Sequence, residues 1–175
     1  MILNIGCGST KKRKLAKPGE PLEWGDDVIH LDNNPDHNPD VVWDLTVHPL
    51  PFEDGYFDEI HAYDVLEHLA YQGDYEFFFK EFTEYWRLLK TDGLFCALVP
   101  NPNGKWAYGD PSHKRVITPE NLTYLSQQQY EEQVGITALS DFRNIYKADF
   151  KPIYATLDEI TFRFVLQKQQ GVFDK

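Results

Sequence analysis

The chain of 175 residues has only two cysteines, Cys7 and Cys96, which lie far apart and lack the spacing of metal ligands. This scarcity excludes a disulfide-stapled scaffold, and we expect two free thiols in a reducing compartment. No apolar run approaches the roughly 20 residues of a membrane-spanning helix, and the N-terminus lacks the charged and apolar regions of a signal peptide. These absences predict a cytoplasmic protein without membrane contact.

Positive charge is also scarce: 17 lysines and arginines stand against 28 acidic residues, which gives a net charge of −11. Such a balance opposes binding to a phosphate backbone, so nucleic acid is not the partner we expect. The basic run "KKRKLAK" over 11–17 is a local exception, which we interpret as a solvated loop. The length and the 42% hydrophobic content predict one domain over residues 1–175 with a real core.

Short apolar runs that read as strands alternate with helical patterns along the first two thirds of the chain. In the longest helical pattern Phe78, Phe82, Trp86 and Leu89 recur at helical spacing, and we expect Gly93 to be its left-handed C-cap. The expected strands cover 2–5, 27–32, 40–45, 57–63 and 94–100.

The last third begins with "TPENLTYLSQQQ", where Thr118 and Pro119 suit the N-cap and first turn of a helix. Two further strands, around 144–155 and 159–167, are separated by a short link and predict a hairpin. The whole pattern predicts an α/β fold: a three-layer, Rossmann-like sheet of seven strands, mostly parallel, with helices on both faces and an antiparallel C-terminal hairpin strand. Two prolines and two glycines interrupt the segment 9–25, so we expect the first crossover helix to be short or absent.

Gly6 and Gly8 form a turn directly after the first expected strand, and Asp32 ends the second. In such sheets ligands bind at the carboxyl ends of the strands, where the strand order reverses. A glycine turn lets backbone amides approach a ligand, and a carboxylate can accept hydrogen bonds from both hydroxyls of a ribose. The third glycine of the dinucleotide fingerprint is missing, because Lys11 stands there, and this disfavours a nicotinamide-dependent oxidoreductase.

Several ordered segments resemble the class I S-adenosylmethionine-dependent methyltransferases, close to the type 11 domain. "LNIGCG" is similar to their first motif and Asp32 to their ribose-binding acid. "LPFEDGYFDEIHAYDVLEHL" and "RLLKTDGLFCALVPN" resemble the stretches around their fourth and fifth strands, and the likeness runs from about Leu3 to Asn101. The resemblance implies a methyltransferase with S-adenosylmethionine as its cofactor.

The resemblance also implies a set of cofactor-binding residues. Asp32 would hold the ribose hydroxyls, and Asp44 would take the adenine amino group. Asp64 would close the site near the reacting centre, and Asn4 stands where many relatives carry an acid. The remaining expected contacts are Gly6, Cys7 and Gly8 along the methionine moiety, and Asn33 and Leu45 on either side of the adenine.

Methyl transfer to an oxygen or nitrogen acceptor proceeds mainly by alignment, and a base is needed only when the acceptor must lose a proton. We therefore interpret His113 as the best candidate for acceptor activation, with Asp64 beside it. Trp106 and Tyr108 lie in a Gly/Pro-rich loop that we interpret as a flap over the acceptor. Glu67 and His68 complete the expected substrate side.

Three other functions stay open. The spacing of Asp64, Glu67 and His68, with the later His113, is similar to the metal site of the small-RNA 2′-O-methyltransferases, although we expect no bound metal. A cofactor-binding protein without catalysis, or another nucleotide-binding α/β enzyme such as an aminopropyltransferase, also fits. The methyl acceptor, whether a small molecule or a macromolecule, and the oligomeric state do not follow from the sequence.

Overall fold

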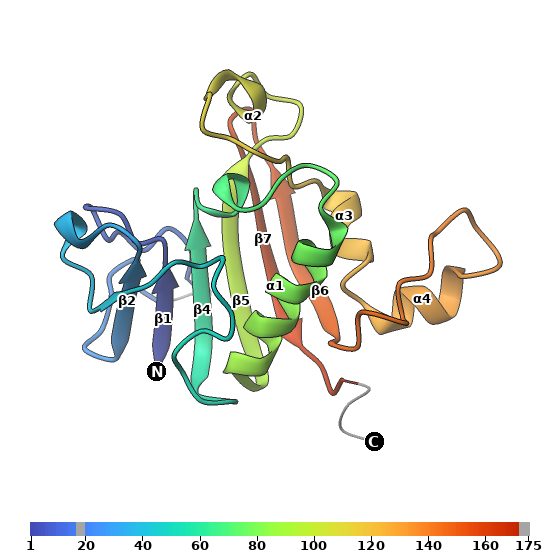
Figure 1. The fold of residues 1–175 in the computed structure, drawn as a ribbon, viewed down its shortest axis with the longest axis horizontal. Coiled ribbons are helices and arrows are strands. Elements are labelled where there is room, and N and C mark those ends of the chain that lie inside the picture. Colours follow the sequence, from blue (N-terminus) through green and yellow to red (C-terminus); the bar gives the residue numbers. More distant parts are fainter. Residues whose placement is uncertain (17–19, 172–175) are drawn as a thin grey trace.

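A computed structural model describes residues 1–16 and 20–171. Seven strands form one sheet in the order β3-β2-β1-β4-β5-β7-β6 (Figure 1). The first five strands are parallel, while β7 is antiparallel to both of its neighbours, which confirms the predicted fold class and the hairpin. The strands are β1 (Ile2–Ile5), β2 (Val28–Asp32), β3 (Val41–Val42), β4 (Phe57–Tyr63), β5 (Leu89–Pro100), β6 (Phe150–Leu157) and β7 (Thr161–Lys168).

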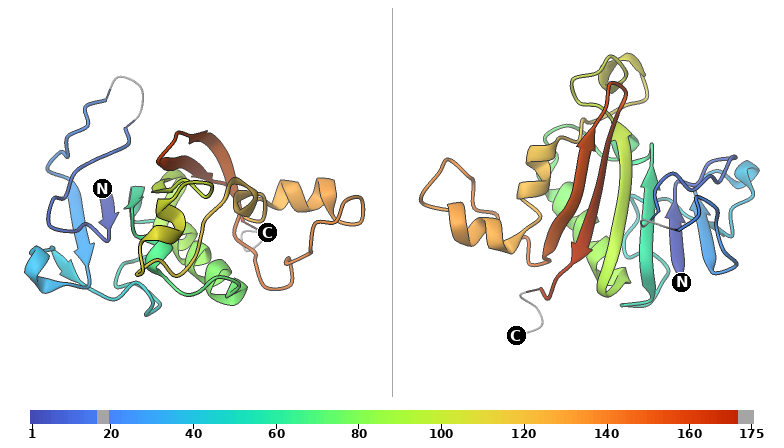
Figure 2. Two further views of the ribbon diagram at one scale, coloured as in Figure 1. Left: turned by 90° about the horizontal axis from the view of Figure 1, so that it is seen from above. Right: turned by 180° about the vertical axis from the view of Figure 1, so that it is seen from behind.

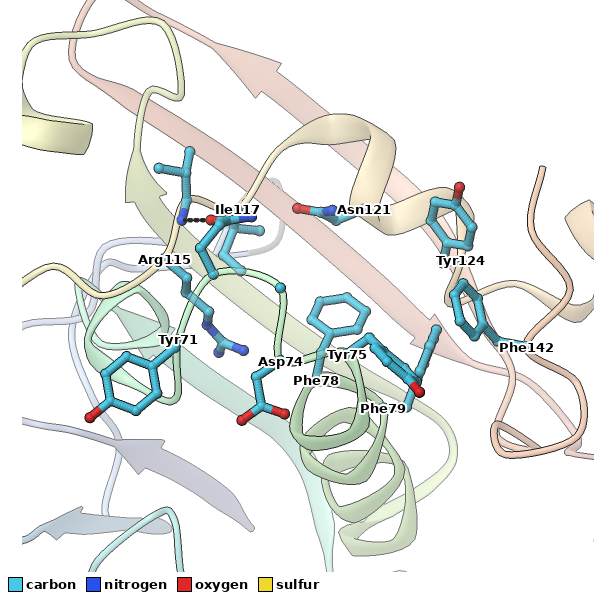
Figure 3. A pocket seen from close by; sticks show the side chains of 13 residues that line it. Tyr71, Asp74, Tyr75, Phe78, Phe79, Arg115, Ile117, Asn121, Tyr124 and Phe142 are labelled. Carbon is cyan, nitrogen blue, oxygen red and sulfur yellow. Dashed lines mark hydrogen bonds between the residues drawn. The ribbon is translucent and has the colours of Figure 1, made fainter. Parts of the chain in front are cut away.

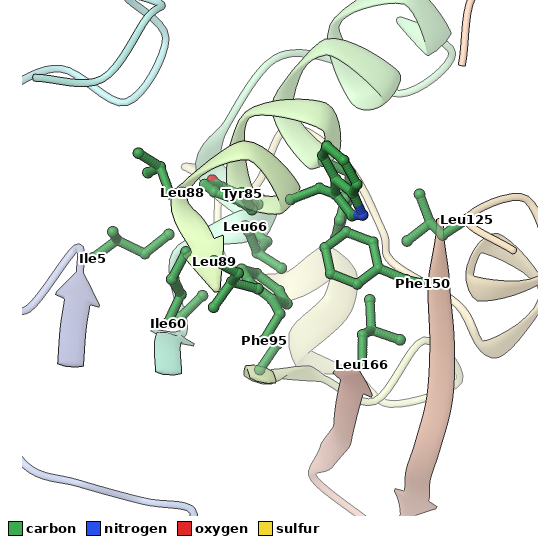
Figure 4. Close-up of a cluster of buried hydrophobic side chains, with 14 of the residues drawn as sticks. Ile5, Ile60, Leu66, Tyr85, Leu88, Leu89, Phe95, Leu125, Phe150 and Leu166 are labelled. Atoms are coloured by element: carbon green, nitrogen blue, oxygen red, sulfur yellow. The ribbon is translucent and has the colours of Figure 1, made fainter. Parts of the chain in front are cut away.

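One long helix, α1 (Tyr75–Leu88), packs on the sheet and supplies most of the helical part of the core. The Asp74 side chain caps it by accepting a hydrogen bond from the Phe77 amide at 3.1 Å. Its buried rings lie against β5, where Tyr85 stacks on Phe95 at a centroid distance of 4.8 Å (Figure 4). The shorter helices are α2 (Trp106–Gly109), α3 (Pro119–Thr123) and α4 (Gln127–Gln133), with 3₁₀ turns η1 (Pro35–His37) and η2 (Leu66–His68).

Two expectations about helix ends were wrong. Gly93 is not the C-cap of α1: it lies inside β5, and the left-handed residue is Asp92, with φ of 61°. Gly93 is needed for a close approach instead, because a Cβ there would come within 2.8 Å of the Lys90 carbonyl oxygen. The single helix expected after Thr118 is two helices, since α3 ends at Thr123 and Ser126 caps α4 through the Gln129 amide.

The two faces of the sheet are covered differently (Figure 2). The long helix α1 lies on one face. The described residues between β1 and β2 contain no helix, as expected, and cross the other face as coil, so the expectation of helices on both faces is wrong for this part of the sheet. The basic run is only partly a solvated loop, because the Arg13 side chain is buried and lies 3.0 Å from the Glu59 carboxylate. Lys17 lies outside the described residues.

Cys7 and Cys96 are not joined in a disulfide, as predicted, and both thiols are buried. Among the residues that the structure describes, no helix has the length and apolar character needed to cross a membrane.

Candidate functional site

The strand order reverses at β1, which lies between β2 and β4, so the turn after β1 stands at the switch point of the sheet. Gly6 and Gly8 both adopt φ of 58°, the left-handed region that favours glycine. A Cβ on Gly6 would lie 2.4 Å from the Val65 side chain, so this turn packs directly on the segment after β4. A Cβ on Gly8 would meet no atom within 4 Å, so Gly8 faces open space where a ligand can approach its backbone.

Asp32 converges on this turn, as the sequence predicts. Its Oδ2 accepts a hydrogen bond from the Gly8 amide at 2.8 Å, and its Oδ1 accepts one from the Asn34 amide at 2.9 Å. His37 Nδ1 lies 3.2 Å from the same Oδ1. The residue Asp32 is 6% exposed, yet its Oδ2 keeps a second lone pair for a hydroxyl donor. The residues therefore fit a ribose placed beside the glycine turn.

Asn4 and Cys7 lie beneath the glycine turn and are buried. The Asn4 amide nitrogen is 3.1 Å from His30 Nδ1, so this side chain is joined to β2. Burial, reinforced by the negative charge of Asp32, raises the pKa of the Cys7 thiol to about 11. Cys7 is consequently a neutral thiol at physiological pH that contributes packing beside the turn.

The expected adenine contacts follow β2 and β3. Asn33 is exposed directly after Asp32, while Leu45 is buried in the core cluster. Asp44 is exposed and forms a local turn in which its Oδ1 accepts hydrogen bonds from the Thr46 amide and hydroxyl, each at 2.8 Å. These bonds lower the pKa of the Asp44 carboxyl, so it is an anion that can accept a hydrogen bond from an amino group.

Asp64 follows β4 in a left-handed conformation, with φ of 53°, and its carboxylate contacts the Lys14 ammonium. The Leu15 amide donates a hydrogen bond to the Tyr63 hydroxyl at 2.9 Å, so the segment after the glycine turn crosses the carboxyl end of β4. Lys14 is a neighbour of the site that the sequence did not identify, because a lysine in a basic run gives no sign of which acid it meets.

Glu67, His68 and His113 form the second half of the site, and candidate ligand atoms of the three lie within 4.8 Å of one another. His113 Nε2 lies 4.0 Å from Glu67 Oε1 and 3.8 Å from Asp110 Oδ2. The His68 ring meets the His113 ring edge-on, with centroids 4.8 Å apart. The backbone joins the two segments, since the Lys114 amide donates to the Glu67 carbonyl at 2.8 Å.

The Glu67 carboxyl is 2% exposed, and neither of its oxygens has a hydrogen-bond partner among the described residues. Burial, reinforced by the negative charge of Asp64, raises its pKa to about 8. His113 Nδ1 is likewise enclosed without a partner. A carboxyl and an imidazole in this state form a functional-site candidate, because buried polar groups are normally hydrogen-bonded.

Trp106 and Tyr108, the remaining expected substrate residues, lie on α2 and are exposed. This helix stands near the tip of the β6–β7 hairpin (Figure 1). The Asn101 amide donates a hydrogen bond to the Ile160 carbonyl in that hairpin. The loop thus divides into a part that carries His113 to Glu67 and a part that projects into solvent. A role for Trp106 and Tyr108 against an acceptor stays a prediction.

The sheet order, the left-handed glycine turn and the acid at the end of β2 define an α/β protein with the architecture of class I methyltransferases. Residues 3–97 match the family model described as "Methyltransferase domain". The chain belongs to this methyltransferase family, and S-adenosylmethionine is its cofactor.

Solved structures share this fold at low sequence identity. An S-adenosylmethionine-dependent methyltransferase from Archaeoglobus fulgidus is 20% identical, with a TM-score of 0.60 over 95% of this chain and 85% of that one. A protein from Methanococcus maripaludis that is assigned to the same class of methyltransferases is 17% identical, with a TM-score of 0.53 over 98% of this chain and 78% of that one. The trans-methyltransferase CalH, solved with S-adenosylhomocysteine, is 14% identical, with a TM-score of 0.60 over 96% and 51%. No curated protein matches the sequence.

Proposed function

We propose that this methyltransferase methylates an oxygen or nitrogen atom of an acceptor bound beyond the carboxyl ends of β4 and β5, with His113 taking up the acceptor's proton. The observation that carries the proposal is the enclosed pair of Glu67 and His113, with Nε2 and Oε1 4.0 Å apart. Glu67 follows β4, the neighbour of β1 in the sheet, and His113 follows β5, the next strand along. A proton acceptor is needed there only for acceptors that lose a proton, which favours hydroxyl and amino groups.

The proposed cofactor contacts lie at the carboxyl ends of β1, β2 and β3. The amides of the Gly6–Gly8 turn would lie along the methionine moiety, Asp32 would accept from the ribose hydroxyls, and Asp44 would accept from the adenine amino group. When bound, the cofactor supplies an electrophilic methyl group on a sulfonium. Asp32→Ala should weaken cofactor binding at least tenfold, about 1.4 kcal/mol, by calorimetry. Asp36→Ala, an exposed acid on η1, is the control, and unchanged affinity in Asp32→Ala would refute the assignment.

The protein's own part in the reaction is alignment and proton removal. When bound, S-adenosylmethionine would supply the methyl group that the acceptor's lone pair takes up, and its sulfur would retain the electrons of the broken sulfur–carbon bond. The proton released from the acceptor passes to Nδ1 of His113, the ring nitrogen without a partner among the described residues. Nε2 faces the Asp110 carboxylate at 3.8 Å, and this negative charge favours the imidazolium that results. Because Nδ1 is enclosed, the loop that carries His113 must open to admit an acceptor.

His113→Gln tests this role. With a panel of phenol, alcohol and amine acceptors, we expect kcat for S-adenosylhomocysteine formation to fall by roughly 100-fold or more. Cofactor affinity should change less than about twofold, because His113 does not belong to the glycine turn or to β2. Gln128→Ala, exposed on α4, is the matched control. Turnover at the wild-type rate in His113→Gln would contradict the proton transfer. An absence of turnover with every acceptor in the wild-type protein itself would favour a cofactor-binding protein without catalysis.

A metal-assisted methyl transfer to a ribose 2′-hydroxyl is the second candidate, and the Glu67–His68–His113 cluster favours it. One carboxylate and two imidazoles suit a divalent transition-metal ion, which would polarise the attacking hydroxyl. The net charge of −11 opposes an RNA acceptor. Calorimetric titration with Mg²⁺, Mn²⁺ and Co²⁺ separates the candidates: uptake that Glu67→Gln abolishes supports the metal, and no uptake at millimolar metal removes it.

A further inference from the structure

A cavity of about 180 Å³ lies on the α1 face of the sheet, outside the cofactor site. It lies between the segment 71–75, which leads into α1, and the segment 115–117 together with α3 (Figure 3). Six of the thirteen residues that line it are aromatic, and they come from four separate segments of the chain (Figure 3). These rings belong to Tyr71, Tyr75, Phe78, Phe79, Tyr124 and Phe142.

The size and the walls indicate what kind of molecule fits. A cavity of about 150 Å³ lined by apolar side chains holds one benzene ring, so this cavity suits a single ring with one small substituent. Aromatic walls favour a flat aromatic guest, because offset and edge-to-face contacts between rings add to the burial of apolar area. An aliphatic ring of the same size would bury similar area without those contacts.

Arg115 supplies a polar group on the wall of the cavity. Its side chain is 4% exposed, and two of its nitrogens are engaged: Nε donates to the Leu66 carbonyl at 2.7 Å, and Nη2 to Glu81 Oε2 at 2.6 Å. Nη1 has no hydrogen-bond partner among the described residues and is itself closed off from water, so a ligand oxygen reaches it after a shift of the surrounding side chains. A buried donor without an acceptor is unfavourable, so an oxygen brought by a ligand would complement it. Glu81 balances the guanidinium charge, so a carbonyl oxygen suffices and a carboxylate oxygen also fits.

We propose that this cavity binds a single-ring aromatic molecule whose carbonyl or carboxylate oxygen accepts a hydrogen bond from Arg115 Nη1. Asp74 also lines the cavity, but its Oδ1 is held at the start of α1 by the Phe77 amide. The residues Arg115, Val116 and Ile117 separate this cavity from the enclosed space beside Glu67 and His113. The site therefore adjoins the proposed acceptor-activating pair, although the proposal concerns binding alone and does not depend on methyl transfer.

Binding of benzoate and benzamide, followed by amide chemical shifts of the labelled protein, tests the proposal. We expect saturable binding, with the largest shifts at the residues that line the cavity. Toluene, which lacks the oxygen, and cyclohexanecarboxylate, which lacks the flat ring, should each bind at least tenfold more weakly. Val116→Phe fills the cavity from a half-buried position and should weaken benzoate binding at least tenfold, while Gln128→Ala leaves it unchanged.

Tyr124→Leu removes one ring of the wall without filling the space, and it serves as a second variant if Val116→Phe does not fold. S-adenosylmethionine affinity, measured on the same samples, should be unaffected, so failure of this site and failure of the methyltransferase assignment are told apart. The proposal is overturned if neither benzoate nor benzamide binds saturably up to about 10 mM. Shifts confined to other surfaces, or wild-type binding in both folded variants, would overturn it equally.

Discussion

Two separate constraints require glycine at Gly6, whereas one constraint requires it at Gly8. Both have φ of 58°, but only a Cβ on Gly6 would meet Val65, at 2.4 Å. Gly8→Ala should therefore cost only the left-handed conformation, about 1–2 kcal/mol of unfolding free energy. Gly6→Ala should add an overpacking cost of about 1–3 kcal/mol.

Urea unfolding of the two glycine variants, with Val65→Ala alone and combined with Gly6→Ala, measures these costs. The Val65→Ala change should offset part of the Gly6→Ala cost, which appears as a favourable coupling in the double-mutant cycle. Equal destabilisation by Gly6→Ala and Gly8→Ala would show that the approach of the turn to the β4 segment is not tight.

The Glu67 carboxyl makes stability depend on pH in a defined direction. Its pKa is about 8 in the folded chain because it is buried, against an ordinary value of 4.5. The protonated form is favoured by folding, so the stability it contributes is complete below about pH 4.5 and is lost as pH rises toward 8. The full shift corresponds to roughly 5 kcal/mol.

Glu67→Gln keeps the shape and removes the titration. With EDTA present, we expect this variant to gain stability relative to wild type between pH 5 and pH 8, measured by urea unfolding at both values. Glu53→Gln, at an exposed acid, is the control. A stability difference between Glu67→Gln and wild type that is the same at both pH values would contradict a buried, protonated carboxyl.

At the same scale, the sequence predicted the convergence of Gly8 and Asp32 because both follow apolar strands whose carboxyl ends share one edge of the sheet. It also placed Glu67 and His113 beyond β4 and β5. It did not identify Arg115, since nothing in "HKRV" distinguishes a buried arginine from the exposed lysine before it. Burial of such a residue depends on Glu81, a partner 34 positions away on α1.

Among the elements, those with strong hydrophobic periodicity were predicted closely. The bounds of β1 and β4 coincide with the expected strands. The helix α1 contains Phe78, Phe82 and Trp86 of the expected apolar stripe, whereas Leu89 is its C-cap and the first residue of β5. The errors fall at boundaries, where tertiary contacts decide. Chain reversal after α1 uses Asp92 instead of Gly93, because the glycine is needed where the backbone comes close to Lys90.

The pair of Arg115 and Glu81 joins the segment before α3 to α1. Both side chains are at least 96% buried, and their closest atoms are 2.6 Å apart. Removing one partner leaves a buried charge without compensation, so Arg115→Ala should destabilise the protein by about 3–5 kcal/mol. Arg143→Ala, which breaks an exposed pair with Asp141, should cost less than about 1 kcal/mol. Chemical unfolding of both variants checks this contrast, and equal losses would show that α1 is not tied to this segment through Arg115.

In the whole molecule, the least predictable feature is the cover over the second face of the sheet. The sequence showed that a helix between β1 and β2 was improbable, because prolines and glycines interrupt the segment. It gave no periodicity from which to predict what lies there instead. The structure shows coil held by polar side chains, with the Arg13 guanidinium 5.6 Å from the centroid of the Trp24 ring and the Trp24 ring edge-on to His61.

Arg13 is the centre of this cover, and its loss should loosen the coil. Its side chain is 6% exposed and Nη2 lies 3.0 Å from Glu59 Oε2, which is also 2.9 Å from His61 Nε2. Arg13→Ala removes the guanidinium from a buried carboxylate, so we expect a loss of about 3–5 kcal/mol in unfolding free energy. Lys12→Ala changes an exposed neighbour of the same charge and should stay within about 0.5 kcal/mol.

Hydrogen exchange locates the effect. In Arg13→Ala we expect faster exchange in the amides of Leu15 and its neighbours, and little change in α1 beyond that caused by the loss of global stability, since α1 lies on the other face. If Arg13→Ala and Lys12→Ala unfold alike, the ion pair with Glu59 does not hold the coil. In that case apolar contacts, with Trp24 first among them, would have to keep the second face covered.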